Sequence, residues 1–211
     1  MDLVFGIAAI GSDGAEAGML DRVLVDPGKR EVTHIVVRSP RVSEDVLLPL
    51  SLVQGSVEDR LLLHAAAADL ENMPRYYEGR ASSPPAGRVD TSVVREPPDR
   101  RESLEAALNV PPDAREYGPE TRVATADGAE GHLISLAADH YTNGLSELRV
   151  AGLGEGAVTI PERWIGELRP GLITLTAPRD ELERLLGAQA ASYVATEFET
   201  PREGMERGLS D

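Results

Sequence analysis

The strongest constraint on the fold is an internal repeat. The tetrapeptide DGAE occurs at 13–16 and again at 127–130, and both times an apolar run follows that stops at an aspartate. Further matches keep the same order along the chain, while their offset drifts only from 114 to 112 residues. They pair LLPLSLV (47–53) with TIPERWI (159–165), LLLHA (61–65) with ITLTA (173–177), and ADLENM (68–73) with DELERL (180–185). Matching blocks in one order indicate a tandem duplication.

Each copy has the pattern of a β-meander followed by a helix. The segment EVTHIVVR is rich in β-branched residues and lies between turn-forming residues, which favours a strand. The Asp-Gly steps of the repeat predict hairpin turns, because glycine adopts the positive φ that such turns need. A leucine stripe after Pro178 predicts a C-terminal helix, and Leu70 and Met73 mark a shorter one. The five strands predicted for the first copy lie near residues 3–10, 18–26, 31–38, 45–49 and 60–65.

Five strands in so short a segment favour a closed sheet, since an open one would leave two exposed edges. The predicted fold class is therefore mainly β, with two small, partly open five-stranded β-barrels, each followed by a helix. The predicted division of the chain is a first barrel at 1–73, a proline-rich linker or strap at 74–120, a second barrel with its C-terminal helix at 121–196, and a flexible tail at 197–211.

The spacing of glycines, aspartates and prolines resembles the PRC-barrel family, the small barrel of the photosynthetic reaction centre H subunit and of a ribosome maturation factor. The first copy carries the resemblance at Asp13, Gly14, Gly18, Val23, Asp26, Val36, Pro49, Val53 and Leu63. The second carries it at Asp127, Gly128, Gly131, Asp139, Val150, Pro161, Ile165 and Leu175, and departs from it at AADHYTNG (137–144). The resemblance implies a docking or assembly module without catalysis, and its short motifs assign no functional residue.

The middle segment, 74–120, contains 8 of the 15 prolines and little hydrophobic periodicity. This composition predicts a flexible tether, a strap across both barrels or a partner-binding segment, with one short helix at 102–108. The aromatic residues that would anchor a partner are Tyr76, Tyr77, Tyr117 and Trp164. For Trp164, a plug in the barrel is the simpler alternative, because tryptophan side chains are mostly buried.

The charge balance limits the partners. The formal net charge is −15, and acidic residues outnumber basic ones throughout the chain. Such a surface repels phosphate groups, which disfavours nucleic acids and anionic membranes. The chain has no cysteine and no apolar run of about 20 residues, and Asp2 lies where a signal peptide would need a positive charge. A soluble, cytoplasmic protein is expected.

No catalytic constellation is evident in the sequence. The four histidines lack the spacing of metal ligands, and the chain has no P-loop, dinucleotide or nucleophile-elbow motif. We therefore expect no enzyme activity, no catalytic or metal-binding residue and no cofactor. The leading hypothesis is an adaptor or assembly protein that presents an acidic surface to a basic or neutral protein, with a homodimer formed through the C-terminal helix. The alternatives are a ribosome- or RNA-associated maturation factor and a small-molecule-binding protein that uses the groove between the barrels.

Overall fold

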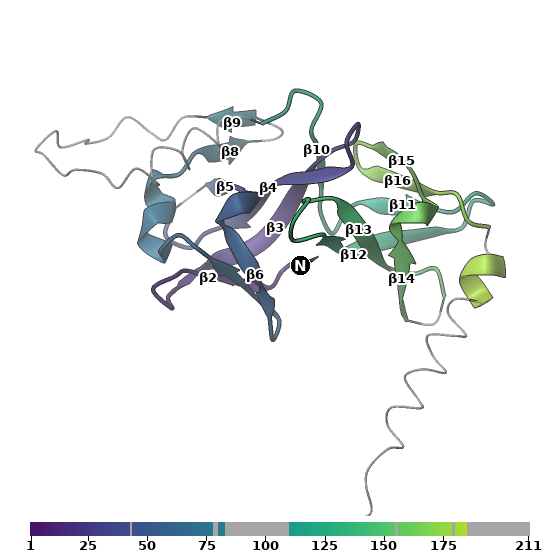
Figure 1. Ribbon diagram of the computed structural model, residues 1–211, viewed down its shortest axis with the longest axis horizontal. Helices are drawn as coiled ribbons and strands as arrows, with labels where there is room; N and C mark the ends of the chain where they lie inside the picture. Colours follow the sequence, from purple (N-terminus) through teal and green to yellow (C-terminus); the bar gives the residue numbers. More distant parts are fainter. Residues whose placement is uncertain (43, 78–79, 83–109, 155, 179, 185–211) are drawn as a thin grey trace, which may run out of the picture.

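The computed structural model describes residues 1–42, 44–77, 80–82, 110–154, 156–178 and 180–184. Within them the protein is mainly β and forms two multi-stranded sheets that lie side by side (Figure 1). The predicted helix at 102–108, the tail at 197–211 and the C-terminal helix beyond residue 184 lie outside the described residues.

The first sheet has nine strands in the described part of the chain. Eight follow the order β6-β7-β2-β3-β4-β5-β8-β9, and β10 pairs with β3 beside β2. Two 3-10 helices belong to this half, η1 (Leu50–Leu52) and η2 (Ala67–Asn72). The strands are β2 (Ala8–Ile10), β3 (Glu16–Asp26), β4 (Glu31–Arg38), β5 (Asp45–Pro49), β6 (Val53–Val57), β7 (Arg60–Leu63), β8 (Arg75–Tyr77), β9 (Arg80–Ser82) and β10 (Arg115–Tyr117).

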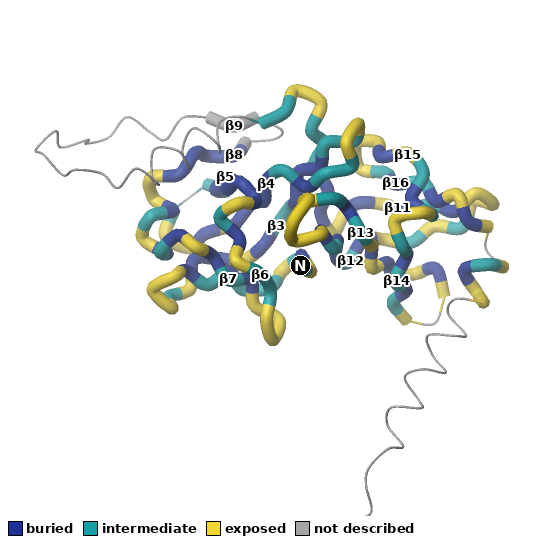
Figure 2. The backbone as a smooth tube through the Cα atoms, in the orientation of Figure 1, coloured by how far each residue is buried: buried dark blue, intermediate teal, exposed yellow. Residues whose placement is uncertain are grey.

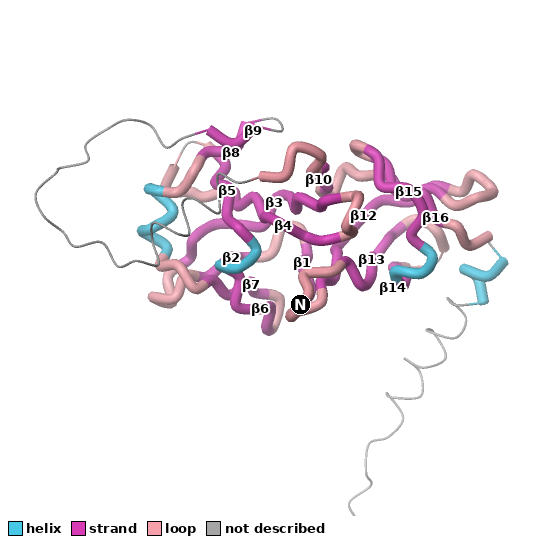
Figure 3. The backbone as a smooth tube through the Cα atoms, turned by 45° about the horizontal axis from the view of Figure 1, so that its top comes forward, coloured by secondary structure: helices cyan, strands magenta, loops and turns pink. Residues whose placement is uncertain are grey.

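The second sheet has seven strands over the same described ranges. Its order is β14-β13-β12-β11-β16-β15, and β1 pairs with β12 beside β11. Its 3-10 helix, η3 (Glu162–Trp164), links β14 to β15 as η1 links β5 to β6 (Figure 3). The strands are β1 (Asp2–Val4), β11 (Arg122–Ala124), β12 (Glu130–Ala138), β13 (Leu145–Ala151), β14 (Ala157–Pro161), β15 (Ile165–Arg169) and β16 (Leu172–Leu175).

The two sheets repeat one another residue by residue. Met19 lies opposite Arg38 in the first sheet, and the residues 113 positions later, His132 and Ala151, lie opposite each other in the second. The two register shifts between β3 and β4, at Leu20/Arg22 and at Leu24/Val25, recur at the equivalent places in β12. A further shift near Ala17 in the first sheet marks the one-residue difference in length between the copies. The internal repeat inferred from the sequence is therefore present in the strand pairing.

The repeated motif forms turns in both copies, as predicted. Gly14 and Gly128 adopt φ values of +75° and +88° at the Asp-Gly steps. The aspartates that end the apolar runs also have matching contacts. Asp26 Oδ1 accepts hydrogen bonds from the Gly28 and Lys29 amides. Asp139 Oδ1 accepts them from the amides of Tyr141 and Thr142. These bonds lower the pKa of Asp139, because they favour the charged carboxylate.

The first strand of each copy pairs with the other copy. β1 belongs to the first copy by sequence, but it runs antiparallel to β12 in the second sheet, with Leu3 opposite Leu136. β10 is the equivalent strand of the second copy, and it runs antiparallel to β3, with Tyr117 opposite Val23. Val23 and Leu136 are equivalent positions, and Leu3 and Tyr117 are both 0% exposed. The N-terminus consequently lies between the two sheets (Figure 1).

A second reciprocal contact joins the copies at their equivalent hairpins. The Val32 amide donates to the Asn143 carbonyl at 2.8 Å, and the Leu145 amide donates to the Arg30 carbonyl at 2.7 Å. These two bonds exchange roles under the offset of 113, and Glu31 and Gly144 form the β-bridge between them. An interface in which each contact has its reciprocal is the pattern of a two-fold dimer. The chain therefore folds as an intramolecular pseudo-dimer.

One apolar core runs through both copies. Buried aliphatic residues of both sheets form a single cluster, which includes Leu3 and Tyr117 on the exchanged strands. Buried segments follow the strands from one half into the other (Figure 2). A smaller cluster of Leu24, Val36, Leu47 and Tyr76 covers the opposite face of the first sheet. The exchanged strands thus contribute to stability by burying side chains across the junction.

Two details of the predicted strands were wrong. The strand expected near 3–10 is two strands, β1 and β2, which join different sheets, because the chain turns at Gly6 with a φ of +80°. The strand β6, which contains Gly55 and polar residues, was not predicted.

The segment 74–120, predicted from its composition to be a linker or strap, contributes short strands to the first sheet. Residues 75–77, 80–82 and 115–117 form β8, β9 and β10.

Candidate interaction surface

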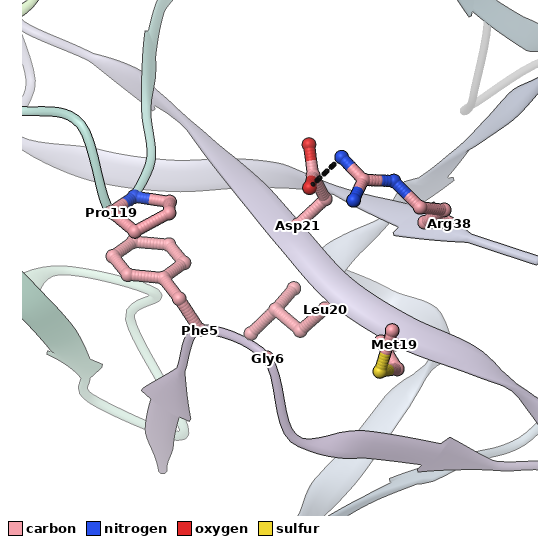
Figure 4. A pocket seen from close by; sticks show the side chains of 7 residues that line it. All are labelled: Phe5, Gly6, Met19, Leu20, Asp21, Arg38 and Pro119. Carbon is pink, nitrogen blue, oxygen red and sulfur yellow. Dashed lines mark hydrogen bonds and ion pairs between the residues drawn. The ribbon is translucent and has the colours of Figure 1, made fainter.

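A cleft of about 250 Å³ lies where the exchanged strands leave the two sheets. The links that follow β1 and β10 supply Phe5 and Pro119, which occupy equivalent positions in the two copies and lie beside each other (Figure 4). Hydrogen bonds from the Gly6 amide to the Leu20 carbonyl and from the Leu20 amide to the Ile7 carbonyl hold the first link on β3. The complete lining is Phe5, Gly6, Met19, Leu20, Asp21, Arg38 and Pro119.

The apolar part of the cleft is accessible. Met19 is 45% exposed, one of three large apolar side chains that are exposed among the described residues. Its neighbour Leu20 is buried, because successive side chains of a strand point to opposite faces. Phe5 is half-buried and packs against the core. Met19 thus places an unbranched, flexible apolar side chain at the solvent-exposed edge of the cleft, as protein-binding surfaces of broad specificity often do.

A chain of ion pairs forms the polar rim. Asp21 Oδ1 accepts a hydrogen bond from Arg38 at 2.5 Å, and Asp21 Oδ2 accepts one from Arg22 Nε at 3.2 Å. Arg22 also pairs with Glu120 of the second copy. The Arg38 Nε lies 3.7 Å from an Asp45 carboxylate oxygen. Three carboxylates therefore share two guanidinium groups beside the cleft.

The pKa values at the rim reflect this excess of negative charge. The pKa of Asp45 is raised, first by burial and then by the nearby Asp21 carboxylate, although Arg38 and Arg22 oppose the shift. Burial would lower the pKa of Arg22, but the carboxylates of Glu120, Glu116 and Asp21 together raise it. A further cation near the rim would meet favourable electrostatics.

The second copy lacks this rim. The residues equivalent to Asp21, Arg22, Arg38 and Asp45 are Ile134, Ser135, Ala151 and Ala157. The strand register is the same in both copies, so the difference lies in the side chains alone. Apart from Glu120, the polar rim is therefore contributed by the first copy.

A second hollow of about 400 Å³ is lined by Leu24 of β3 and Tyr76 of β8, on the face of the first sheet opposite the main core. Tyr76 lies in it, and its hydroxyl donates to Glu116 Oε2 on β10 at 2.8 Å. Pro170, from the β15–β16 turn of the second copy, closes one side. The remaining lining residues are Leu24, Val110, Pro111, Pro112, Ala114 and Arg115.

The four aromatic residues predicted to anchor a partner lie in different surroundings. Tyr76 lines the 400 Å³ hollow and is 6% exposed. Tyr117 is a core residue, whose hydroxyl has no hydrogen-bond partner among the described residues. Burial raises its pKa to about 12. A partner would reach Tyr117 only if β10 left the first sheet, so its contact with a partner stays a prediction.

The other two aromatics lie apart from these. Tyr77 is in β8, and its side chain lies outside the described residues. Trp164 follows the proline that ends β14, packs partly against the core and carries the Arg163 guanidinium 5.2 Å from its ring centroid. Tyr76 and Tyr77 of β8 and Tyr117 of β10 belong to the first sheet, whereas Trp164 lies in η3 of the other half.

Sequence reasoning missed the residues of the 250 Å³ cleft. One signal for Met19 exists in the sequence, because strand alternation places it on the face opposite the buried Leu20. The approach of Phe5 to Pro119 has no local signal, because it depends on the strand exchange.

The described residues contain neither a cluster of metal-ligating side chains nor a helix that could span a membrane. No group of three or more potential metal-ligating side chains occurs in the described ranges. None of the helices within those ranges has the length and apolarity to cross a bilayer.

Comparison with known proteins adds no assignment. No protein-family model matches the chain, and no curated protein sequence matches it.

Proposed function

We propose that this chain is a non-catalytic tandem PRC-barrel adaptor that binds a protein partner at the cleft between its exchanged strands. The observation that carries the proposal is the cleft itself. It combines an exposed apolar side chain, Met19, with a charged rim, at the point where both copies meet. An apolar centre surrounded by a polar rim is the usual anatomy of a protein–protein contact.

The barrel assignment is part of this proposal. The ends of the shared six-strand order, β5 and β6 in the first copy, are joined by only three residues of η1. The equivalent ends, β14 and β15, are joined by three residues of η3. So short a connection draws the sheet edges together, and we infer that each sheet curls into a partly open barrel. The resemblance of the sequence to PRC-barrels supports this inference.

The experiment is a comparative capture from a lysate of the source organism. The immobilised chain is compared with the Met19→Glu variant and with Tyr141→Ser, which removes a 92% exposed aromatic elsewhere. We expect a reproducible protein to bind the wild type and Tyr141→Ser but not Met19→Glu, and to titrate the same way when purified. A partner that binds all three equally, or the absence of any reproducible partner, would contradict the proposal.

The 400 Å³ hollow favours a second candidate, a small-molecule-binding protein. Its volume falls within the range of about 300–1,000 Å³ typical of ligand sites, whereas the cleft at Met19 lies below it. A thermal-shift screen against a metabolite library tests this function. A stabilising compound whose effect is lost in Ala114→Trp would support it, because the added ring would fill the hollow. A flat screen would count against it.

A further inference from the structure

We propose that the partner segment at the cleft carries a basic residue next to a large apolar anchor residue. This inference rests on the proposed function and specifies the chemistry that the same cleft selects. The anchor would contact Met19 and Phe5, and the basic residue would lie at the rim formed by Asp21, Asp45 and Glu120.

The size of the cleft limits the apolar part of the partner. The volume of the cleft, about 250 Å³, is closer to that of one large side chain than to that of a typical small-molecule site. Phe5, Leu20 and Pro119 are apolar along its walls, and the links that carry Phe5 and Pro119 are tied to strands on both copies. A pocket whose walls are fixed before binding spends little free energy on ordering itself. One aliphatic or aromatic anchor therefore fits it best.

The charge at the rim selects a cation. Asp21, Asp45 and Glu120 hold only the two guanidinium groups of Arg22 and Arg38 among the described residues. Glu116 adds a fourth carboxylate close enough to raise the pKa of Arg22. The net charge near the rim is thus negative, as is that of the whole chain at −15. A third guanidinium or ammonium group would pair with carboxylates that now share their partners.

The same charges argue against other occupants. A second copy of the chain would bring its own charge of −15 to the contact, and the repulsion would oppose association. A nucleic acid would bring phosphates to a rim that already has more carboxylates than guanidinium groups. Arg38 is 60% exposed on its side chain, but the Asp21 carboxylate neutralises it. A basic protein segment is the occupant that the charge distribution favours.

The test is a selection from a display library of short random peptides against the intact chain. We expect enriched peptides to contain Arg or Lys next to Leu, Ile, Met or Phe. Binding of the synthesised peptides should fall at least about tenfold in Met19→Glu. It should fall about three- to tenfold in the double variant Asp45→Asn/Glu120→Gln, and it should weaken as salt rises.

The control is a double variant with the same loss of charge at a distance. Glu162→Gln/Asp180→Asn removes two exposed carboxylates of the second copy that do not line the cleft. Affinity should change less than about twofold in this variant, because screening weakens distant surface charges.

The outcomes separate the two proposals. Peptides that lose binding in Met19→Glu but are not basic, or that bind Asp45→Asn/Glu120→Gln as tightly as the wild type, would overturn the basic partner and leave the adaptor function standing. Peptides that bind Met19→Glu unchanged, or a selection that enriches none, would overturn both. Equal losses in the rim and control variants would also overturn the inference, since only net charge would then matter.

Discussion

The two copies share a backbone plan and differ in what they present outside it. Six strands follow the same order in both, with matching registers apart from one extra shift near Ala17 in the first copy. The first copy adds β8 and β9 and carries the charged rim, whereas the second has Ile134, Ser135 and Ala151 at the equivalent positions. The comparison shows that the repeated sequence pattern specifies the buried strands of both copies. The exposed side chains, which would contact a partner, differ between the copies without changing the strands.

The largest expected effect concerns the exchanged strand β1. Leu3→Ala should lower the free energy of unfolding by about 2–5 kcal/mol, because Leu3 is fully buried and its removal leaves a cavity. The single core shared by both copies predicts that the chain still unfolds in one transition, as measured by urea denaturation with circular dichroism. Val57→Ala, at a 56% exposed position, should change stability by less than about 0.5 kcal/mol. Two separate transitions would show that the copies are independent.

The next effect compares equivalent glycines. A Cβ added at Gly18 would collide with the Arg38 carbonyl, and one at Gly131 would collide with the equivalent Ala151 carbonyl. Gly18→Ala and Gly131→Ala should each cost about 1–3 kcal/mol, because strands must shift to relieve the overlap. Gly28→Ala, where the added Cβ lies 3.3 Å from the Asp26 carboxylate, should cost less. Gly18 also has a φ of +151°, so its substitution should cost more than that of Gly131. Thermal unfolding measures all three, and a cost at Gly131 no larger than that at Gly28 would contradict the shared close approach of the strands.

A smaller effect is a pH dependence of stability that comes from Tyr117 on β10, because the equivalent residue on β1, Leu3, does not titrate. Burial raises the pKa of Tyr117 from its usual value of 10 to about 12, so the unfolded chain loses this proton first as pH rises. The stability contributed by the neutral phenol is complete below pH 10 and is lost between about pH 10 and 12. Tyr117→Phe should remove on the order of 1–2 kcal/mol of this alkaline loss and change stability little at pH 7. Tyr141→Phe, at a 92% exposed position, is the control, and an equal effect there would contradict the assignment.

The smallest effect on stability concerns the rim. Arg38→Ala gives the first copy the residue that the second copy has at position 151. The Arg38 side chain is 60% exposed, so losing its pairs with Asp21 and Asp45 should cost less than about 1 kcal/mol, and less still at high salt. Chemical denaturation at low and high salt measures this difference. A cost above about 2 kcal/mol would show that the rim is structural.

The sequence predicted the repeated framework because its signals are local. β-branched runs, Asp-Gly steps and prolines at strand ends located the strands from β3 to β5 and their counterparts. The strand exchange could not be predicted, because β1 has only three residues and its partner lies more than 130 residues away. The cleft could not be predicted for the same reason, since Phe5 and Pro119 meet only through that exchange. The rim combines residues from three strands and from the link after β10. The spacing of these residues in the sequence does not indicate that they lie close together.

The most direct test of the pseudo-dimer is a disulfide between β1 and β12. Asp2 lies opposite Ala137, and residues opposite each other in antiparallel strands have Cα separations of about 4.5–5.5 Å, within reach of a disulfide. The chain has no cysteine of its own, so Asp2→Cys/Ala137→Cys offers only this pair. We predict that mild oxidation of the monomer links these two residues within one chain, as peptide mass mapping would show. Two cysteines that stay reduced, or that link only between chains, would contradict the exchange of first strands.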